Sequence, residues 1–438
     1  MSEKSTTGNI QKKLNYFQTL AIIVGVVIGS GVFFKPAKVY GAAGSPGLGI
    51  LAWVAGGIIT MAAALTLAEL ASAIPKTGGM FTYLKELYGE SVSYLLGWVQ
   101  TVIYFPGTDA ALAIIFATQA TFFIPMNDMT QKILAIGLAI FLTVVNIIST
   151  QLVGKIQVVF TIAKLIPIFA IIIFGFIMGT VHDYTPMVGP TATATGFGAA
   201  ILGTLWAYSG WEAVCNVAGE VENPKKNLPK ALIVGISIVM IAYIGINAAI
   251  VNVMPMEAVA ASKTAASDAA VILFGPVGAA IISAGIMISI FGALNGFLLV
   301  GARVPFAMGK GKLLPFADFF GKESKSGTPV NALIVQLVFT ILYIISGSFD
   351  MLTNLVVFAL WIFFVLAVAG VFVLRKKHPE LTSEYKVPLY PIIPIIGIGG
   401  GLFILYSTLM TDTKNALIGL AITLAGIPIY LLIKKKDK

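Results

Sequence analysis

The chain has few residues of the kinds that form disulfides, metal sites or hydrolytic centres. Its 438 residues include one cysteine, Cys215, and two histidines, His182 and His378, which lie far apart in the sequence. A single cysteine excludes an internal disulfide, and two distant histidines form no metal-binding motif. Nucleophilic and metal-assisted catalysis both need clusters of such groups. We therefore expect a protein that is not an enzyme and that holds no metal and no cofactor.

Charged residues are also scarce. They make up 11% of the chain, while hydrophobic residues make up 58% and the mean hydropathy is +0.95. This composition excludes a soluble globular domain. Apolar runs of about 20 residues recur about twelve times, each long enough to cross roughly 30 Å of hydrocarbon. The runs are continuous, whereas a β-barrel has short segments of alternating polarity, so the sequence predicts an all-α membrane protein with about twelve transmembrane helices.

The predicted spans follow these apolar runs. They are 15–39, 49–73, 92–124, 130–150, 156–180, 195–220, 228–254, 269–308, 330–347, 350–374, 389–411 and 415–433. The third and the eighth are longer than a perpendicular helix needs, so we expect them to be tilted or to extend past the membrane surface.

The distribution of basic residues predicts the topology. With loops assigned by alternation from a cytoplasmic N-terminus, about 22 of the 28 Lys and Arg lie inside and about five outside. This excess predicts that both termini are cytoplasmic in a multi-pass protein of the plasma membrane. The basic clusters fit contact with the anionic lipid bilayer, and we expect no nucleic-acid partner.

Two spans are interrupted by small residues near mid-membrane, at 28–31 in the first and at 208–210 in the sixth. An unwound stretch at bilayer depth is tolerated only where it lines a cavity inside the protein. A matched pair of broken helices is the best pointer in a sequence to a transporter's binding site. The alternative is a pair of packing kinks.

Five predicted crossings separate the starts of the two broken helices, so the halves of the chain are expected to be inverted copies. The sequence predicts a 5+5 inverted repeat with helices 1 and 6 unwound, plus two C-terminal helices. The predicted parts are a cytoplasmic tail 1–14, repeats 15–180 and 195–374, helices 389–433 and a tail 434–438.

The breaks offer both hydrogen-bond donors and hydrogen-bond acceptors to a ligand. In the first helix, N–H groups of Ser30 and Gly31 stand at a new helix N-terminus, which binds carboxylates. Free carbonyls accept hydrogen bonds from an ammonium group. They are expected near Ile28, Trp206, Ala207 and Ser209. An α-amino acid carries both groups on adjacent atoms and satisfies both halves at once.

Several side chains inside the spans also need an explanation. Lys164 is a cation with no acid nearby in the sequence, so it either replaces a bound sodium ion, carries a proton or reaches to the cytoplasmic surface. Glu212 either contacts substrate or caps helix ends, and Glu69 is expected in a structural ion pair. The rings of Trp206 and Tyr208 flank the pocket and are expected to gate it, although Tyr208 is nearly as well suited to core packing.

The motifs resemble those of one family. The matching segments are 29–33, 74–79 with Tyr83, 154–157 leading to Lys164, 206–211, 220–224 with 228–229, and 292–296 with Arg303. Together they resemble the L-type amino-acid transporter family of the amino acid, polyamine and organocation superfamily over almost the whole chain. The bacterial members, including serine/threonine and alanine/serine/cysteine exchangers, look closest, which implies that the membrane is the inner membrane of a bacterium.

The resemblance implies a function and roles for residues. The function is Na⁺-independent antiport of small neutral L-amino acids, in the range of Ala, Ser, Thr and Cys, by alternating access. The implied substrate-binding residues are Ile28, Gly29, Ser30, Gly31, Trp206, Ala207 and Ser209. Lys164 and Ser289 would occupy the place of a sodium site, and Trp206 would gate the pocket toward the outside.

Two departures from the family bear on these expectations. Glu212 stands where relatives often have an uncharged residue, which puts the strict neutrality of the substrate in doubt. Heteromeric animal relatives carry an external cysteine between helices 3 and 4, and residues 125–130 contain none, so no disulfide-linked heavy chain is expected. The alternative functions are a proton-coupled symporter in which Lys164 titrates and a sensor that binds amino acids without moving them.

Overall fold

The computed structural model describes residues 14–74, 78–148, 164–216, 221–324, 328–381 and 383–436. Within these ranges the regular structure is helical, apart from one isolated bridge between Leu14 and Val221. The prediction of an all-α protein is therefore confirmed. Most of the predicted tail 1–14, the start of the fifth predicted span, the end of the sixth and the motif at 154–157 lie outside the described residues.

Among the described residues, eight helices or continuous helical runs are long and apolar enough to cross a membrane. They are α3 (Pro46–Ala73), the run α5–η1–α6 (Glu90–Val99, Gln100–Tyr104, Phe105–Ala120), α7 (Asp128–Ile148), α12 (Pro224–Val253), α14 (Ala265–Gly301) continued by α15 (Arg303–Lys310), α18 (Phe349–Lys377), α19 (Ile392–Thr411) and α20 (Thr413–Lys436). The bent pair α1 (Tyr16–Val27) and α2 (Gly31–Ala43) counts as a ninth span if it is taken as one.

The other three predicted spans correspond to shorter helices. These are α9 (Leu165–Met178), α10 (Ala194–Tyr208) and α17 (Val330–Ser346). The multi-spanning helical architecture agrees with the sequence, while the count of twelve stays a prediction. Four short helices connect the spans: α4 (Gly79–Tyr88), α11 (Ala213–Asn216), α13 (Met256–Ala261) and α16 (Ala317–Phe320).

The two longest spans are irregular inside. In the third, the π-helical turn η1 separates α5 from α6. In the eighth, Gly275 has a φ of 68°, in the left-handed region that favours glycine, and Pro276 follows it. Both irregularities lie in helices that pack around the centre of the molecule.

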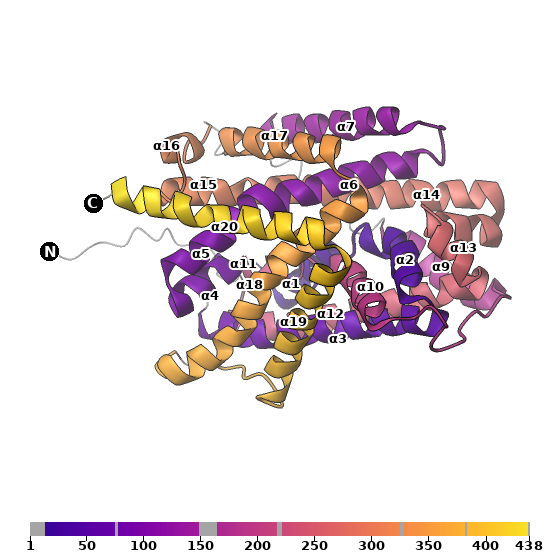
Figure 1. Ribbon diagram of the computed structural model, residues 1–438, viewed down its shortest axis with the longest axis horizontal. Coiled ribbons are helices and arrows are strands. Elements are labelled where there is room, and N and C mark those ends of the chain that lie inside the picture. The colour runs from indigo at the N-terminus through magenta and orange to yellow at the C-terminus, as the bar shows by residue number, and fades with distance from the viewer. Residues whose placement is uncertain are drawn as a thin grey trace.

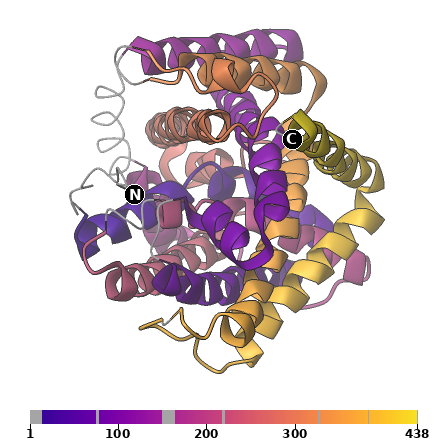
Figure 2. The same ribbon diagram turned by 90° about the vertical axis from the view of Figure 1, so that its left-hand side faces the viewer.

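The broken helices occupy the middle of the molecule (Figures 1 and 2). Helix α3 runs along one flank, helices α7 and α17 lie side by side on the opposite flank, and α18 and α19 cross the others obliquely. Helices α1, α2 and α10 lie between α3 and the layer formed by α6 and α14. This arrangement surrounds both breaks with other helices.

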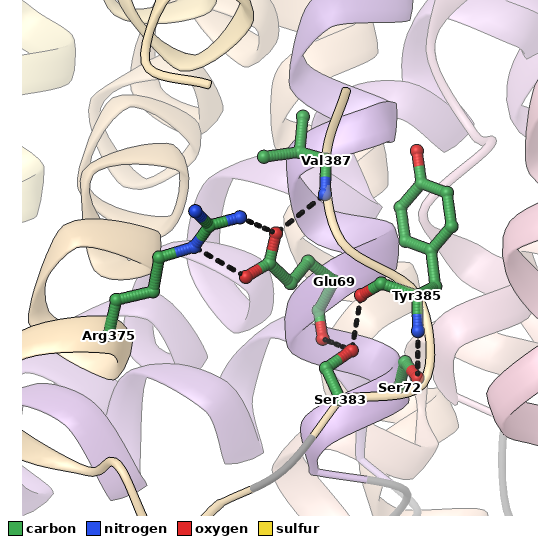
Figure 3. Close-up of polar contacts among 6 residues, drawn as sticks. All are labelled: Glu69, Ser72, Arg375, Ser383, Tyr385 and Val387. Carbon is green, nitrogen blue, oxygen red and sulfur yellow. Dashed lines mark hydrogen bonds and ion pairs between the residues drawn. The ribbon is translucent and has the colours of Figure 1, made fainter. Parts of the chain in front are cut away.

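One end of the molecule is fastened by a buried ion pair (Figure 3). Glu69, near the end of α3, accepts hydrogen bonds from Nε and one terminal nitrogen of Arg375, each with an N···O distance of 2.8 Å. The backbone N–H of Val387 donates to the same carboxylate at 2.7 Å. The Glu69 side chain is 3% exposed, so the expected structural ion pair is present and its partner is the end of α18.

The segment after α18 is tied to the same place. Ser383 donates to the backbone carbonyl of Glu69 at 3.3 Å, and the N–H of Tyr385 donates to Ser72 Oγ at 3.4 Å. Ser72 in turn donates to the carbonyl of Lys225 at the start of α12. Three spans are thus held together at this end of the molecule.

We predict that Glu69→Gln destabilises the protein by about 3 kcal/mol, because it leaves the Arg375 guanidinium without its carboxylate. The measurement is the thermal unfolding midpoint of the purified protein in detergent. Lys225→Ala is the matched control, because its pair with Glu384 is partly exposed and has an N···O distance of 3.9 Å, and it should change stability by less than about 1 kcal/mol. Equal effects of the two variants would contradict this role of Glu69.

Candidate functional site

The first break lies between α1 and α2, whose axes differ by 47°. Helix α1 ends at Val27, Ile28 has extended backbone angles, and α2 begins at Gly31 with Ser30 before it. The Ser30 carbonyl accepts hydrogen bonds from the N–H groups of Phe33 and Phe34. The first N–H groups of α2 and the last carbonyls of α1 have no partner within their own helices, so they are available to a ligand or to side chains.

The second break follows α10. Ser209 is extended, Gly210 has a φ of +105°, and the chain resumes helical structure at α11. A left-handed φ of this size is one that an L-residue rarely adopts without strain, so glycine is required at this position. The hydroxyl of Ser209 donates to the carbonyl of Leu205 at 2.8 Å and satisfies one group near the end of the helix.

The two breaks pack directly against one another. A Cβ added to Gly31 would lie 2.4 Å from the Cα of Ala207, and a Cβ added to Gly210 would lie 2.9 Å from Cγ1 of Val26. Each glycine thus allows one broken helix to approach the backbone or side chain of the other. The structure brings the two predicted halves of the site into contact.

Tyr243 of α12 bridges the two breaks from one side. Its hydroxyl oxygen lies 2.8 Å from the carbonyl oxygen of Val27 and 3.0 Å from that of Ala207, so its one proton can be donated to either. Its ring packs against Trp53 and Tyr208. One side chain therefore offers a hydrogen bond to backbone carbonyls of both broken helices, which an apolar ring could not do.

A small cavity of about 30 Å³ lies between the breaks. Six of the predicted substrate-binding residues line it: Gly29, Ser30, Gly31, Trp206, Ala207 and Ser209. Side chains of neighbouring helices complete the wall, among them Tyr104, Thr108, Leu112 and Phe297. The volume is close to that of one water molecule, so the walls must separate before a larger ligand enters.

One unpaired polar group lies on the wall of the cavity. The Ser30 hydroxyl is buried without a hydrogen-bond partner in the described part of the chain, on the wall where the carboxylate is predicted. Ile28, by contrast, is buried beside the cavity but is absent from its wall. The roles of these residues in binding stay predictions.

Glu212 is held by the protein. Its Oε1 accepts a hydrogen bond from the hydroxyl of Tyr104 at 2.9 Å, and its Oε2 accepts one from the N–H of Gly210 at 3.0 Å. It is 8% exposed and does not line the cavity. Of the two roles that the sequence left open, this geometry favours capping of the second break.

The two predicted gating rings have different surroundings. Trp206 lines the cavity and packs edge to face on Phe349, with ring centroids 6.2 Å apart. Tyr208 packs on Trp53 and Tyr243, donates to the Trp53 carbonyl at 3.1 Å and does not line the cavity. Trp206 is placed where a gate is expected, whereas Tyr208 occupies the core.

Phe349 forms part of the floor of a vestibule of about 760 Å³, located where α2 ends and α18 begins. The Trp206–Phe349 contact therefore lies between this vestibule and the cavity. Lys35 of α2 is fully buried beside it, with Nζ 2.7 Å from Oδ1 of Asp350, 2.6 Å from Oγ1 of Thr353 and 4.5 Å from the centroid of the Phe349 ring. The vestibule and the Glu69 ion pair stand at opposite ends of α18.

Lys164 lies just before α9 and is 3% exposed. Its amine donates a hydrogen bond to the carbonyl of Gly25, in the last turn of α1. This places the cation beside the first break, as the sequence predicts. Ser289 of α14 is buried too, but its hydroxyl has no hydrogen-bond partner among the described residues, so the structure does not join it to Lys164.

Four buried side chains that make polar contacts in or near this region were not predicted from the sequence. They are Lys35, Tyr104, Asp109 and Tyr243. Lys35 and Asp109 could have been singled out from the sequence, because each is an ionisable residue inside an apolar run. Tyr104 and Tyr243 could not, since an aromatic residue in a transmembrane span has no feature that separates a polar bridge from core packing.

A family model for amino acid permeases matches residues 14–428. The serine/threonine exchanger SteT of Bacillus subtilis is 41% identical over 429 residues, covering 98% of each chain. The b(0,+)-type amino acid transporter 1 of Mus musculus is 32% identical, covering 98% of this chain and 91% of the relative. The large neutral amino acids transporter small subunit 2 of Homo sapiens is 32% identical, covering 97% and 80%.

We predict that Gly31→Ala lowers amino-acid uptake by about tenfold or more, because the added methyl group forces the two breaks apart. The measurement is uptake of radiolabelled L-serine into proteoliposomes loaded with L-serine. Gly137→Ala is the control, because a Cβ at that position meets no atom within 4 Å, and it should behave as wild type. Wild-type uptake by the Gly31→Ala variant would show that the close packing of the breaks is dispensable.

Proposed function

Because the chain belongs to the amino acid permease family, we propose that it exchanges small neutral L-amino acids across the membrane by alternating access, without sodium ions. The observation that carries this proposal is the interlocked pair of broken helices around one cavity. The N-terminus of α2 favours a carboxylate, and carbonyl oxygens at the ends of α1 and α10, each of which has a second lone pair, can accept hydrogen bonds from an ammonium group. Both requirements are met by an α-amino acid.

The rings around the cavity support a short substrate side chain. Tyr104 is held in place by its hydrogen bond to Glu212 and by edge-to-face packing on Phe105 and Phe297. Trp206 is held on the other side by Phe349. A large substrate side chain would have to displace rings that are each fixed by further contacts, which costs packing energy.

The surroundings of Glu212 support a neutral substrate. A carboxylate that already accepts bonds from Tyr104 and Gly210 has less capacity to receive a cationic side chain, and it lies behind the cavity wall. The Glu212 carboxylate is therefore not placed like one that projects into a cavity to bind a ligand.

The position of Lys164 supports a cycle without sodium. An ammonium group beside the carbonyls at the end of α1 supplies the positive charge that a bound ion would otherwise supply. Its recorded hydrogen bond is to a neutral carbonyl, which also favours a second candidate function, proton-coupled symport in which Lys164 titrates.

The cellular setting is proposed on the same basis. We place both termini in the cytoplasm of a bacterium, since the basic ends of α12, α18 and α20 follow the positive-inside pattern. The vestibule then opens to the outside. Cys215 is fully buried in the short helix α11, so we expect the chain to work without a disulfide-linked heavy chain.

Exchange predicts that uptake of radiolabelled L-alanine or L-serine into proteoliposomes depends on internal amino acid. Liposomes loaded with L-serine should take up label at least about tenfold faster than empty ones, because the empty carrier reorients slowly. Equal uptake into loaded and empty liposomes would exclude obligatory exchange. Accumulation driven by an imposed proton gradient in empty liposomes would favour the symport mechanism instead.

A competition panel tests the substrate class. Unlabelled L-Ala, L-Ser, L-Thr and L-Cys should inhibit uptake of L-serine, while L-Trp, L-Lys and L-Arg at equal concentration should inhibit about tenfold less. Strong inhibition by lysine or arginine in wild type, lost in Glu212→Gln, would show that Glu212 contacts substrate. The D-enantiomers serve as controls for stereoselective binding.

A further inference from the structure

Helix α6 contains an acidic residue that the proposed transport cycle does not use. Asp109 is completely buried. Its Oδ2 accepts a hydrogen bond from Nε2 of Gln336 in α17, with an N···O distance of 2.6 Å. Its Oδ1 is buried without a partner among the described residues, and so is Oε1 of Gln336.

The two atoms without partners limit the charge that Asp109 can carry. An ionised carboxylate and an amide oxygen are both acceptors only, so an ionised Asp109 would leave two buried acceptors unsatisfied. A buried charge without a countercharge also carries a large desolvation cost. A protonated carboxyl, by contrast, can donate from Oδ1 to Oε1 of Gln336 while Oδ2 keeps its bond from Nε2.

We propose that Asp109 is a proton-binding site, in which the protonated carboxyl and the Gln336 amide form a closed pair with two hydrogen bonds. One proton then provides the missing hydrogen bond between Oδ1 of Asp109 and Oε1 of Gln336. No charge is buried, and α6 and α17 are joined across the membrane core.

The charged groups of the surrounding helices stand at the helix ends. In the described parts of the elements packed on α6, they are Asp128 and Lys132 in α7, Asp268 in α14, and Asp350 and the basic residues 375–377 in α18. None of them hydrogen-bonds or forms an ion pair with Asp109. Helix α17 and the turn η1 contribute tyrosines only.

Those tyrosines are engaged elsewhere. The hydroxyl of Tyr104 donates to Glu212, and that of Tyr343 in α17 donates to the carbonyl of Val102. Neither is recorded as a partner of Asp109. The proton on Asp109 is therefore the one available means of pairing its second oxygen within the described surroundings.

A second polar pair in the same four helices is neutral. Asn146 of α7 donates from Nδ2 to Oδ1 of Asn295 in α14, at 3.0 Å. Each of the two pairs joins one helix of the α6 and α14 layer to one helix of the α7 and α17 layer. Under the predicted inverted repeat they join equivalent pairs of helices, and a protonated Asp109 makes both of them neutral.

The site is separate from the cavity. Thr108 and Leu112 of α6 line the cavity, whereas Asp109 is directed to α17. Removing the proton would leave a buried charge, so the stability that depends on this pair is fully present only at acidic pH, where the carboxyl of the unfolded chain is also protonated, and it declines as the pH rises until Asp109 ionises in the folded protein. The proposal does not depend on the proposed transport function, because it can be tested on stability and spectra alone.

The test compares wild type with Asp109→Asn in two measurements on the purified protein. The infrared spectrum of wild type should contain the carbonyl band of a protonated carboxyl that the variant lacks. The thermal midpoints should agree within about 2 °C at about pH 4, because asparagine can keep both hydrogen bonds and the carboxyl of the unfolded wild type is then still largely protonated. At alkaline pH the midpoint of wild type should fall below that of the variant.

Two results would overturn the proposal. One is the absence of a difference band in the infrared spectrum, and the other is a midpoint for Asp109→Asn that is lower by more than about 5 °C at neutral pH in folded protein. If Asp109→Asn does not fold, Gln336→Leu takes its place, since it removes the acceptor. A shift of the protonated-carboxyl band in that variant supports the pair, and an unchanged band overturns it.

Discussion

The rest of this structure depends on the need to satisfy backbone groups at bilayer depth. A single broken helix would expose N–H and C=O groups to hydrocarbon at a cost of several kcal/mol each. Here two breaks meet, with Gly31 against Ala207 and Gly210 against Val26. Tyr243 and Glu212 then supply side-chain partners for backbone groups on either side. The site thus lies where two irregular segments pack together, and each segment shields backbone groups of the other from the hydrocarbon.

The buried ionisable groups fall into two kinds. Lys35 with Asp350 and Glu69 with Arg375 are ion pairs, and they stand near the two ends of α18. Lys164, Glu212 and Asp109 lie between those ends and form no ion pair among the described residues. Pairs at the membrane boundaries can open to water when helices move, whereas single groups in the core must be neutral or bound to fixed dipoles.

Much of this arrangement could be predicted from the sequence. Long apolar runs locate the helices well, as the seventh span at 228–254 and helix α12 (Pro224–Val253) show. The breaks follow from small residues at matched positions, and Lys164 follows from its charge. Neither the small residues nor the charge of a residue indicates the direction in which a side chain points. Glu212 is held outside the cavity lining by the nearby N–H of Gly210 and by the hydroxyl of Tyr104, and Tyr104 comes from a distant part of the chain.

The π-turn η1 at Gln100–Tyr104 allows the two parts of this span to accept substitutions separately. A π-turn within an α-helix accommodates one extra residue. The part before it follows one helical register, in which Trp98 packs with α20 through the carbonyl of Ile422. The part after it follows another, which sets Thr108 toward the cavity and Asp109 toward α17. Because the two registers meet at η1, substitutions after this turn can reshape the wall of the cavity without disturbing the half of the helix that packs with α20.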